Sequence, residues 1–319
     1  FYDFHTQHVH VDENVFAYSN RAGGERSLIF YNNAYNTTSG WAKQSTGLNQ
    51  GRGDEGRVIS KSLADSLGLR REENVFYAFR DRRDGLEYIR HSKQLCDEGM
   101  FVELHGYQWY AFIDWREIVD ADGSWGKLAW HLEGRGVESL DYERRARELA
   151  PVLDAFRAYF SVDHLKLLLV LPETHATETQ LLDMLRGSLD EFLRAFSARV
   201  SIHDDAAELL KPCVHSLLHW HRQMSLQPKH KTAKADTVDD ADRARWVVPM
   251  AYALLKPIGV ALARGGDLHD GAGWLDAWLM TRDVASVLTN LLGDSWRGEQ
   301  AGRVVRTALR FAEHPMHRV

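Results

Sequence analysis

The densest group of residues that could bind a metal ion lies near the start of the chain, in the segment HTQHVHVDE. It holds His5, His8, His10, Asp12 and Glu13. In an extended strand His8 and His10 project to the same side. Two imidazoles and a carboxylate such as Asp12 can hold zinc and leave one position for a reactive water. This cluster therefore predicts a metal-dependent hydrolase, or else a strand that carries its histidines at the surface.

A second group of histidines falls on a predicted helix over residues 205–224. His215 and His219 are four residues apart, with Cys213 and His221 nearby. That spacing places both rings on one face of the helix. The protease form of this motif also needs a glutamate between the histidines, which this chain lacks. The flanking leucines suit a packed helix, so we expect core or surface histidines, and neither a metal nor a cofactor.

Aromatic residues in a polar segment form a third candidate site. Tyr35 and Trp41 stand in NNAYNTTSGW, and a flat ring can stack on the apolar face of a glucose unit. The neighbouring Asn32, Asn33 and Asn36 could hydrogen bond to sugar hydroxyls. The segment therefore predicts a carbohydrate contact at Tyr35 and Trp41. The alternative is that Trp41 packs inside a sandwich or against a neighbouring domain.

Composition and charge exclude several classes of function. A formal charge of −6 and a pI of about 6.2 give no basic field for binding nucleic acid. The chain contains no run of eighteen apolar residues, so no membrane span is expected. Two cysteines exclude a disulfide framework and a cysteine-rich zinc site, and they favour a cytoplasmic location.

Two hairpins dominate the first part of the chain. Residues 13–33 form two apolar runs around Gly23 and Gly24, and residues 74–90 form two runs around an Asp-Gly turn pair. The first hairpin carries aromatic and β-branched residues on both faces, which is typical of strands covered on both sides. We therefore expect a large partner against this hairpin.

The remaining strand signals are weaker. Residues 34–57 are polar and predict a surface loop or short irregular strands, and residues 60–69 predict a short helix. Residues 100–119 alternate for nearly their whole length, which indicates one bent strand or two strands with a corner. Even spacing would place Trp109 and Trp115 on one face, in the core.

A change of period near residue 141 divides the chain. We expect an antiparallel β-sandwich-like domain over residues 1–140, with a partly closed barrel as the alternative, and an all-helical domain over residues 141–319. This is a fold of the α+β class with segregated domains. Trp274 and Trp278 fall on one helical stripe and predict packing. Residues 225–242 are polar and predict an exposed connection. Helices are expected at about 176–200, 205–224, 240–263, 272–292 and 297–313.

The running text of the first part resembles a known family. The successive segments are YDF, DENVFAYSN, SLIFYNNAYNTTSGW, FRDRRDGLEYIR, GYQWYAFIDWREI and LEGRGVESL. Together they resemble the region downstream of the catalytic barrel in bacterial proteins of the α-amylase family, glycoside hydrolase family 13. The resemblance covers about residues 1–140. It implies an all-β domain packed against a barrel, in a parent enzyme that cleaves or transfers α-linked glucose.

The same resemblance implies that the catalytic residues lie elsewhere. Retaining glycoside hydrolases use two carboxylates about 5 Å apart, on the ends of barrel strands in this family. The family's nucleophile and acid motifs have no counterpart here, and no alternating strand and helix pattern is present. The pairs His203-Asp204 and His269-Asp270 imitate a family motif by coincidence. No catalytic residue is therefore assigned.

The leading hypothesis is an accessory region that stabilises the missing barrel and contacts α-glucan. Its partner is then the upstream barrel of the same polypeptide. The chain starts at Phe1 without an initiator methionine, so we expect a fragment of a longer protein. The alternatives are a free-standing protein-interaction or carbohydrate-binding module, and the metal-dependent hydrolase that uses the cluster from His5 to Glu13.

Overall fold

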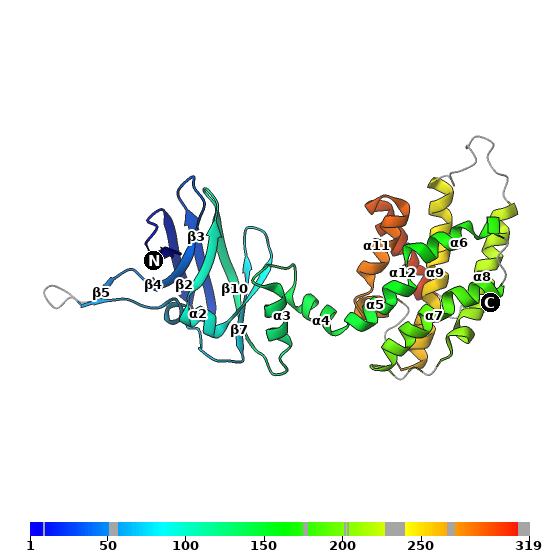
Figure 1. Cartoon of the computed structure of the whole chain (residues 1–319), viewed down its shortest axis with the longest axis horizontal. Coiled ribbons are helices and arrows are strands. Elements are labelled where there is room, and N and C mark those ends of the chain that lie inside the picture. The colour runs from blue at the N-terminus through cyan, green and yellow to red at the C-terminus, as the bar shows by residue number, and fades with distance from the viewer. Residues whose placement is uncertain are drawn as a thin grey trace. The chain divides into compact units, whose positions relative to one another are not determined.

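The computed structural model describes two compact units, Phe1–Arg147 and Glu148–Val319, called here the β-unit and the helical unit (Figure 1). The sequence placed this division near residue 141. Each unit has its own core. The eight-stranded sheet lies in the first unit and the second is helical, as in an α+β protein. The described residues are 1–8, 10–50, 57–174, 178–200, 202, 204–226, 240–266 and 272–311.

Eight antiparallel strands of the β-unit form one curled sheet in the order β8-β7-β10-β3-β2-β1-β4-β9. The sequence indicated a sandwich-like domain of two sheets or a partly closed barrel. One sheet forms rather than two, because β10 pairs with β3 along its first part and with β7 along its second, which joins the two hairpins edge to edge. The strands are β1 Tyr2–Thr6, β2 Val15–Ala22, β3 Glu25–Asn32, β4 Thr38–Ser45, β7 Val75–Asp81, β8 Glu87–His91, β9 Met100–Leu104 and β10 Trp109–Val119. A separate small hairpin joins β5 Leu48–Gln50 to β6 Arg57–Ile59.

Both hairpins predicted from the sequence are confirmed. Strands β2 and β3 pair without a register shift from Val15 opposite Asn32 to Ala22 opposite Glu25. Strands β7 and β8 pair around a turn that contains Gly85, with φ 75°. A positive φ is readily adopted only by glycine, so the turn residues fix these hairpins locally.

Strand β4 is longer and more regular than the surface loop or short irregular strands expected over residues 34–57. It pairs with β1 on one side and β9 on the other. Although its sequence is polar, β4 lies inside the sheet, where two neighbouring strands provide hydrogen-bond partners for its backbone. At Gly40 a Cβ atom would collide with the carbonyl oxygen of His5, so a glycine is needed where β4 approaches β1.

Residues 100–119 form two strands that are not neighbours. Strand β9 lies at the edge beside β4, and β10 lies between β3 and β7. A bulge at Asp114, with φ 54°, shifts the register between Ile113 and Arg116. One extra residue reverses the alternation of side chains. Trp109 is therefore 41% exposed and Trp115 only 7% exposed, which corrects the expectation that they share a core face.

The inner, concave side of the sheet holds the main core. Short helix α1, Leu63–Leu67, closes part of it and confirms the helix predicted over residues 60–69. Ser62 is its N-cap and Gly68 its left-handed C-cap. A further short helix, α2, spans Ser92–Asp97. The fully buried aromatic members of this core include Phe4, Phe30, Tyr77 and Phe79.

A second, smaller core lies on the outer face of the sheet. Helix α3, Ser124–Leu132, covers β7 and β8 there, and α4, Leu140–Glu148, adds Leu140. The sequence predicted no helix over residues 124–132, so α3 is a correction. Its sequence SWGKLAWHL carries a glycine and few aliphatic residues, and burial against the strands stabilises it where intrinsic propensity is weak.

The helical unit packs around buried phenylalanines. Phe192 lies 5.9 Å from Phe156 and 5.3 Å from Phe196 between ring centroids, and Trp278 lies 4.3 Å from Phe196. Trp274 is 1% exposed, which confirms that the predicted stripe is packing. The helices are α5 Ala150–Tyr159, α6 Val162–Thr174, α7 Glu178–Ser197, α8 Ala206–Leu226, α9 Asp240–Arg264, α10 Gly273–Ala277, α11 Thr281–Leu292 and α12 Ser295–Phe311.

Two details of this unit bear on the expectations. The predicted helix over residues 272–292 is divided into α10 and α11, where Leu279 has φ 60°. Of the predicted polar connection, residues 227–239 lie outside the described residues. Among the residues that are described, one helix, Trp246–Arg264, is long and apolar enough to cross a membrane, and 61% of that window is buried within the structure, as in the core helix of a globular unit.

Candidate functional site

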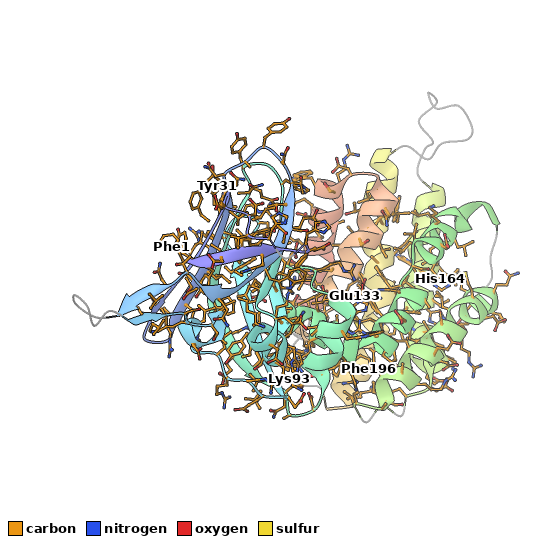
Figure 2. The ribbon with its side chains drawn as sticks, turned by 60° about the vertical axis from the view of Figure 1, so that its left-hand side comes forward. Phe1, Tyr31, Lys93, Glu133, His164 and Phe196 are labelled. Atoms are coloured by element: carbon orange, nitrogen blue, oxygen red, sulfur yellow. The ribbon has the colours of Figure 1, made fainter. Side chains whose placement is uncertain are left out.

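The outer face of the sheet carries two rows of side chains that no described element of the β-unit covers. In the first row Phe16 of β2 lies opposite Tyr31 of β3, and Tyr31 lies opposite Trp109 of β10. The ring planes of Phe16 and Tyr31 are 12° apart, with centroids at 6.4 Å. Figure 2 shows Tyr31 on the β-unit. Phe16 is 45% exposed, so a large apolar ring faces solvent at this row.

The second row lies on the same outer face, over strands β1, β4 and β9. His5 of β1 lies opposite Trp41 of β4, and Trp41 lies opposite Phe101 of β9. The rings of Trp41 and Phe101 are 4.7 Å apart between centroids, and Phe101 is 39% exposed. We call the two rows together the open half-face.

Exposed apolar side chains gathered on one sheet face mark an interaction surface in folded proteins. The open half-face offers aromatic rings and one imidazole and presents no pair of carboxylates across its rows. Its chemistry is therefore burial and stacking rather than acid and base catalysis. Trp41, predicted as a carbohydrate contact or as a packing residue, belongs to this surface.

Two exposed tyrosines stand in loops next to the first row. Tyr35, in the loop after β3, is 84% exposed, and Tyr107, in the loop before β10, is 58% exposed. The Tyr107 N–H donates to the carbonyl oxygen of Ala34 at 3.0 Å. At Gly106 a Cβ atom would collide with the carbonyl oxygen of Tyr35. The loops that carry the two tyrosines are therefore in backbone contact.

Asn32 holds both loops from below. The residue is 1% exposed. Its side-chain oxygen accepts from the N–H of Ala34 at 3.0 Å, and its amide donates to the carbonyl oxygens of Asn36 at 2.7 Å and His105 at 3.0 Å. The prediction that Asn32 faces sugar hydroxyls is therefore wrong, because the buried amide satisfies loop backbone groups.

The sequence suggested that the histidines near the start of the chain lie on one continuous strand. The structure differs. Strand β1 ends at Thr6 and the chain turns, with the Thr6 N–H donating to the carbonyl oxygen of His10 at 2.9 Å. The rings of His8 and His10 are parallel, with centroids 6.5 Å apart. Within the described part of the chain, no three or more His, Cys, Asp or Glu side chains gather into a group that could hold a metal.

Asp12, the third candidate ligand of that cluster, has a structural role. Its carboxylate accepts from the backbone N–H of Asn14 at 3.1 Å and from the Asn14 side-chain amide at 3.2 Å. Partial burial raises the pKa of Asp12, but hydrogen bonds from Thr38 and Asn14 outweigh burial and leave the pKa below its ordinary value. The carboxylate therefore holds the turn into β2.

The histidines of α8 lie at the surface. His215 and His219 are exposed, and His215 Nε2 lies 3.2 Å from a carboxylate oxygen of Glu178. Cys213 is buried, and burial raises the pKa of its thiol to about 11, which makes it an unreactive core residue. The side chain of His221 lies outside the described residues.

Of the two coincidental His-Asp pairs, only Asp204 is described, and it accepts from Arg264 at 2.7 Å. His203, His269 and Asp270 lie outside the described residues. The ion pair gives Asp204 a structural role on the helical unit.

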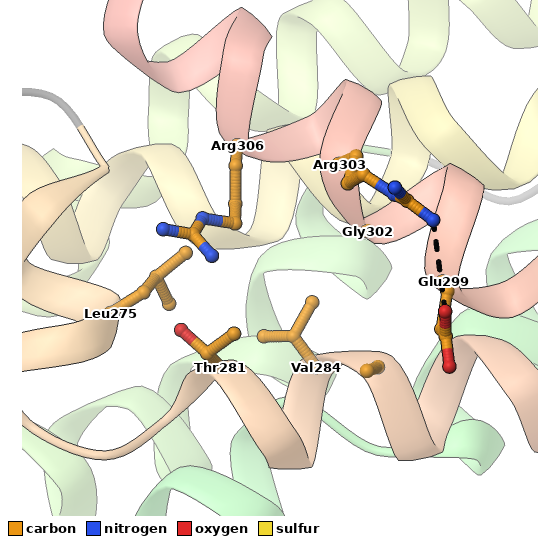
Figure 3. A pocket seen from close by; sticks show the side chains of 8 residues that line it. Leu275, Thr281, Val284, Glu299, Gly302, Arg303 and Arg306 are labelled. Carbon is orange, nitrogen blue, oxygen red and sulfur yellow. Dashed lines mark ion pairs between the residues drawn. The ribbon is translucent and has the colours of Figure 1, made fainter.

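A cavity of about 200 Å³ opens between α11 and α12 in the helical unit (Figure 3). Leu275 and Val284 form its apolar wall. Of the polar groups around it, Thr281 donates to Asp276 at 2.7 Å, and Arg306 is bonded to the same carboxylate. Arg303 lies 3.7 Å from Glu299. The charges are thus neutralised inside the unit, and this cavity is a weaker candidate than the open half-face.

Sequence reasoning did not single out Phe16, Tyr31 and Phe101 of the open half-face or the exposed loop residue Tyr107, and it placed Trp109 in the core. A signal for the first two was present, because the first hairpin is aromatic on both faces. The exposure of Tyr107 had no local signal, because it follows from the contact between two distant loops.

Fold and site together define a two-unit α+β protein with an exposed aromatic sheet face. No family model, curated protein or solved structure matches this chain. The likeness to glycoside hydrolases therefore stands on the sequence segments alone.

Proposed function

We propose that this chain is a non-catalytic accessory region of an α-amylase-family glycoside hydrolase that acts on α-glucans. Its open half-face packs against the catalytic barrel of the same polypeptide and stabilises it. The observation that carries the proposal is the division of the outer sheet face. Helix α3 covers one half in a hydrophobic core, and the other half carries aromatic side chains that have no cover within the described β-unit.

The size of the open half-face favours a partner of domain size. Its two rows extend over six neighbouring strands, from β10 to β9. At a strand spacing of about 4.8 Å, the face is about 24 Å wide. Interfaces between domains of one chain bury about 600–1,500 Å², which a face of this width can supply. A small ligand would leave most of the rings in water.

The division of labour follows from the side chains. Retaining hydrolysis needs two carboxylates about 5 Å apart in a cleft, and the rows offer rings in their place. The role of this chain is therefore to bury the apolar outer surface of a barrel, and the barrel supplies the catalytic carboxylates. Trp41 is assigned to this contact, and Tyr35, in a loop beyond the rows, is not.

The first test is the intact mass of the protein as its source makes it, with peptide mapping. We expect a mass well above 36.5 kDa and peptides of an α-amylase-type barrel. A native mass of 36.5 kDa overturns the proposal, and the open half-face is then assigned to a separate protein that this free-standing module binds.

The second test compares hydrogen exchange in the native protein and in this chain alone. Residues 15–22 and 109–113 should exchange more slowly in the native protein, because the barrel covers their side chains. Residues 124–132 serve as the internal control, since α3 is part of the β-unit in both samples. Equal exchange at all three segments contradicts the assigned contact.

A further inference from the structure

We propose that Tyr35 and Tyr107 form a binding site for a neutral oligosaccharide, separate from the open half-face. Both rings are exposed and both carry a hydroxyl group. Loop 33–37 joins β3 to β4, and loop 105–108 joins β9 to β10. Because β3 pairs with β10 and β4 pairs with β9, the two loops connect the same two parts of the sheet and lie side by side.

The loops are rigid before any ligand arrives. Asn32 bonds to backbone groups of Ala34, Asn36 and His105. Thr37 and His105 are bonded across the loops, with Oγ1 and Nδ1 at 3.2 Å. A surface held in its bound geometry loses little conformational entropy on binding, so two tyrosines on this platform can bind weakly interacting ligands such as sugars.

Tyr107 is the third residue of a β-turn in which the Gln108 N–H donates to the His105 carbonyl oxygen at 3.1 Å, and a positive φ at this position usually selects glycine. Its φ is 57°, in the left-handed region that aromatic residues rarely adopt. Its side chain is 58% exposed, so the ring gains little from packing. Strain of this kind in a folded protein points to a functional constraint on the residue. Here the strained backbone aims an aromatic ring into solvent beside Tyr35.

The side chains of the two loops indicate which class of ligand they can bind. Their sequences are NAYNT and HGYQ, which contain no Asp, Glu, Lys or Arg. Phosphate and nucleic acid ligands need cationic partners, and cationic ligands need carboxylates. A neutral sugar needs rings for its C–H face and amide or hydroxyl groups for its own hydroxyls, and both are present.

The choice among neutral oligosaccharides rests on the proposed function, which makes α-linked glucose the expected sugar. The site itself rests on the loops alone. The two proposals are tested by different measurements, because native mass and hydrogen exchange report on the barrel and sugar titration reports on the loops.

The experiment is calorimetric titration of the full 319-residue chain with maltoheptaose, cellohexaose and xylohexaose. We expect maltoheptaose to bind, and Tyr35→Ala and Tyr107→Ala each to weaken its affinity at least fivefold. Trp130→Ala is the matched control, since Trp130 is an aromatic residue of α3 that is 79% exposed, and it should bind as the parent does.

Tyr107→Gly separates binding from folding. Glycine suits the left-handed backbone, so this variant should keep the parent's thermal midpoint and still lose affinity at least fivefold. Unchanged maltoheptaose affinity in Tyr107→Gly overturns the site. Binding of cellohexaose or xylohexaose alone, lost in the same variants, supports the site and refutes the choice of α-linked glucose. Binding of none of the three sugars by the parent overturns the proposal.

Discussion

Both halves of the outer sheet face carry apolar side chains, but α3 covers only one of them. On β7 and β8 the outward residues Phe76, Ala78 and Ile89 are buried, because α3 brings Leu128 and Leu132 against them. On β2 and β10 the outward rings of Phe16 and Trp109 remain exposed, and Tyr31 of β3 between them is half-buried. The first half therefore contributes to the stability of this unit, and the second keeps its apolar surface for a contact. Sequence hydrophobicity alone does not separate these two uses.

The largest expected effect is on the covered half. Leu128→Ala removes a side chain that is 1% exposed and should lower the free energy of unfolding by about 3 kcal/mol, through lost burial and the remaining cavity. Urea unfolding followed by far-ultraviolet circular dichroism measures it. Trp130→Ala on the same helix should change stability by no more than about 0.5 kcal/mol. Equal effects of the two variants would contradict the assignment of α3 as a cover.

The next largest loss of stability is expected for Asn32, the last residue of strand β3. Asn32→Ala removes the side-chain bonds to the Ala34 N–H and the Asn36 carbonyl oxygen, and it leaves the His105 carbonyl oxygen with the Gln108 N–H alone, which should cost about 2 kcal/mol. The same unfolding experiment measures the change. Asn36→Ala is the matched control, because it removes an exposed amide and keeps the carbonyl that Asn32 binds. A stable Asn32→Ala variant would show that the loops are held by other contacts.

A smaller stability effect, with a large effect on surface properties, is expected on the open half-face. Phe16→Ser with Phe101→Ser should lower stability by about 1 kcal/mol, since half-exposed strand residues contribute little. The pair should at least halve the fluorescence of a bound apolar dye, because the exposed rings supply its site. Trp130→Ser is the comparison. An undiminished dye signal would mean that the apolar surface lies elsewhere.

The smallest effect is a pH dependence at Glu117, on the part of β10 that pairs with β7. A hydrogen bond from Arg70, and another from the Tyr77 hydroxyl at 2.8 Å, hold the pKa of Glu117 below its ordinary value of 4.5. Because the pKa of Glu117 is lower in the folded state than in the unfolded state, the ionised carboxylate stabilises the folded state above pH 4.5. This stabilisation is lost as the pH falls through the folded pKa.

Glu117→Gln should therefore lose less stability than the parent between pH 7 and pH 3.5, by under about 1 kcal/mol, because the group is partly exposed. Urea unfolding at the two pH values measures this difference. Asp12→Asn provides the matching measurement at the entry to β2, where the pKa is also lowered. Parallel pH curves for Glu117→Gln and the parent would exclude the ion pair as a source of stability.

Several elements could be predicted because their signals are local. The hairpins at residues 13–33 and 74–90 follow from turn residues and alternation, and α1 follows from its caps. The helices after residue 141 follow from an apolar stripe of period 3.6. Strand β4 and helix α3 escaped prediction, because partners distant in the chain stabilise them where their own sequences are polar or rich in glycine.

The candidate site divides in the same way. Tyr35 and Trp41 were found because aromatic residues stand out in a polar segment. Tyr107 was not, because its exposure depends on Gly106 meeting the backbone of Tyr35. Trp109 was assigned to the wrong face, because a single bulged residue at Asp114 is invisible in an alternating sequence.

The sequence by itself determined the segregation of strands and helices and the two hairpins, since turn chemistry and hydrophobic period act within a few residues. It also carried the resemblance to the α-amylase family. Only the tertiary structure decided which aromatic residues are core and which are surface. That choice depends on strand order, on the bulge in β10 and on the reach of α3, which are contacts between residues far apart in the chain.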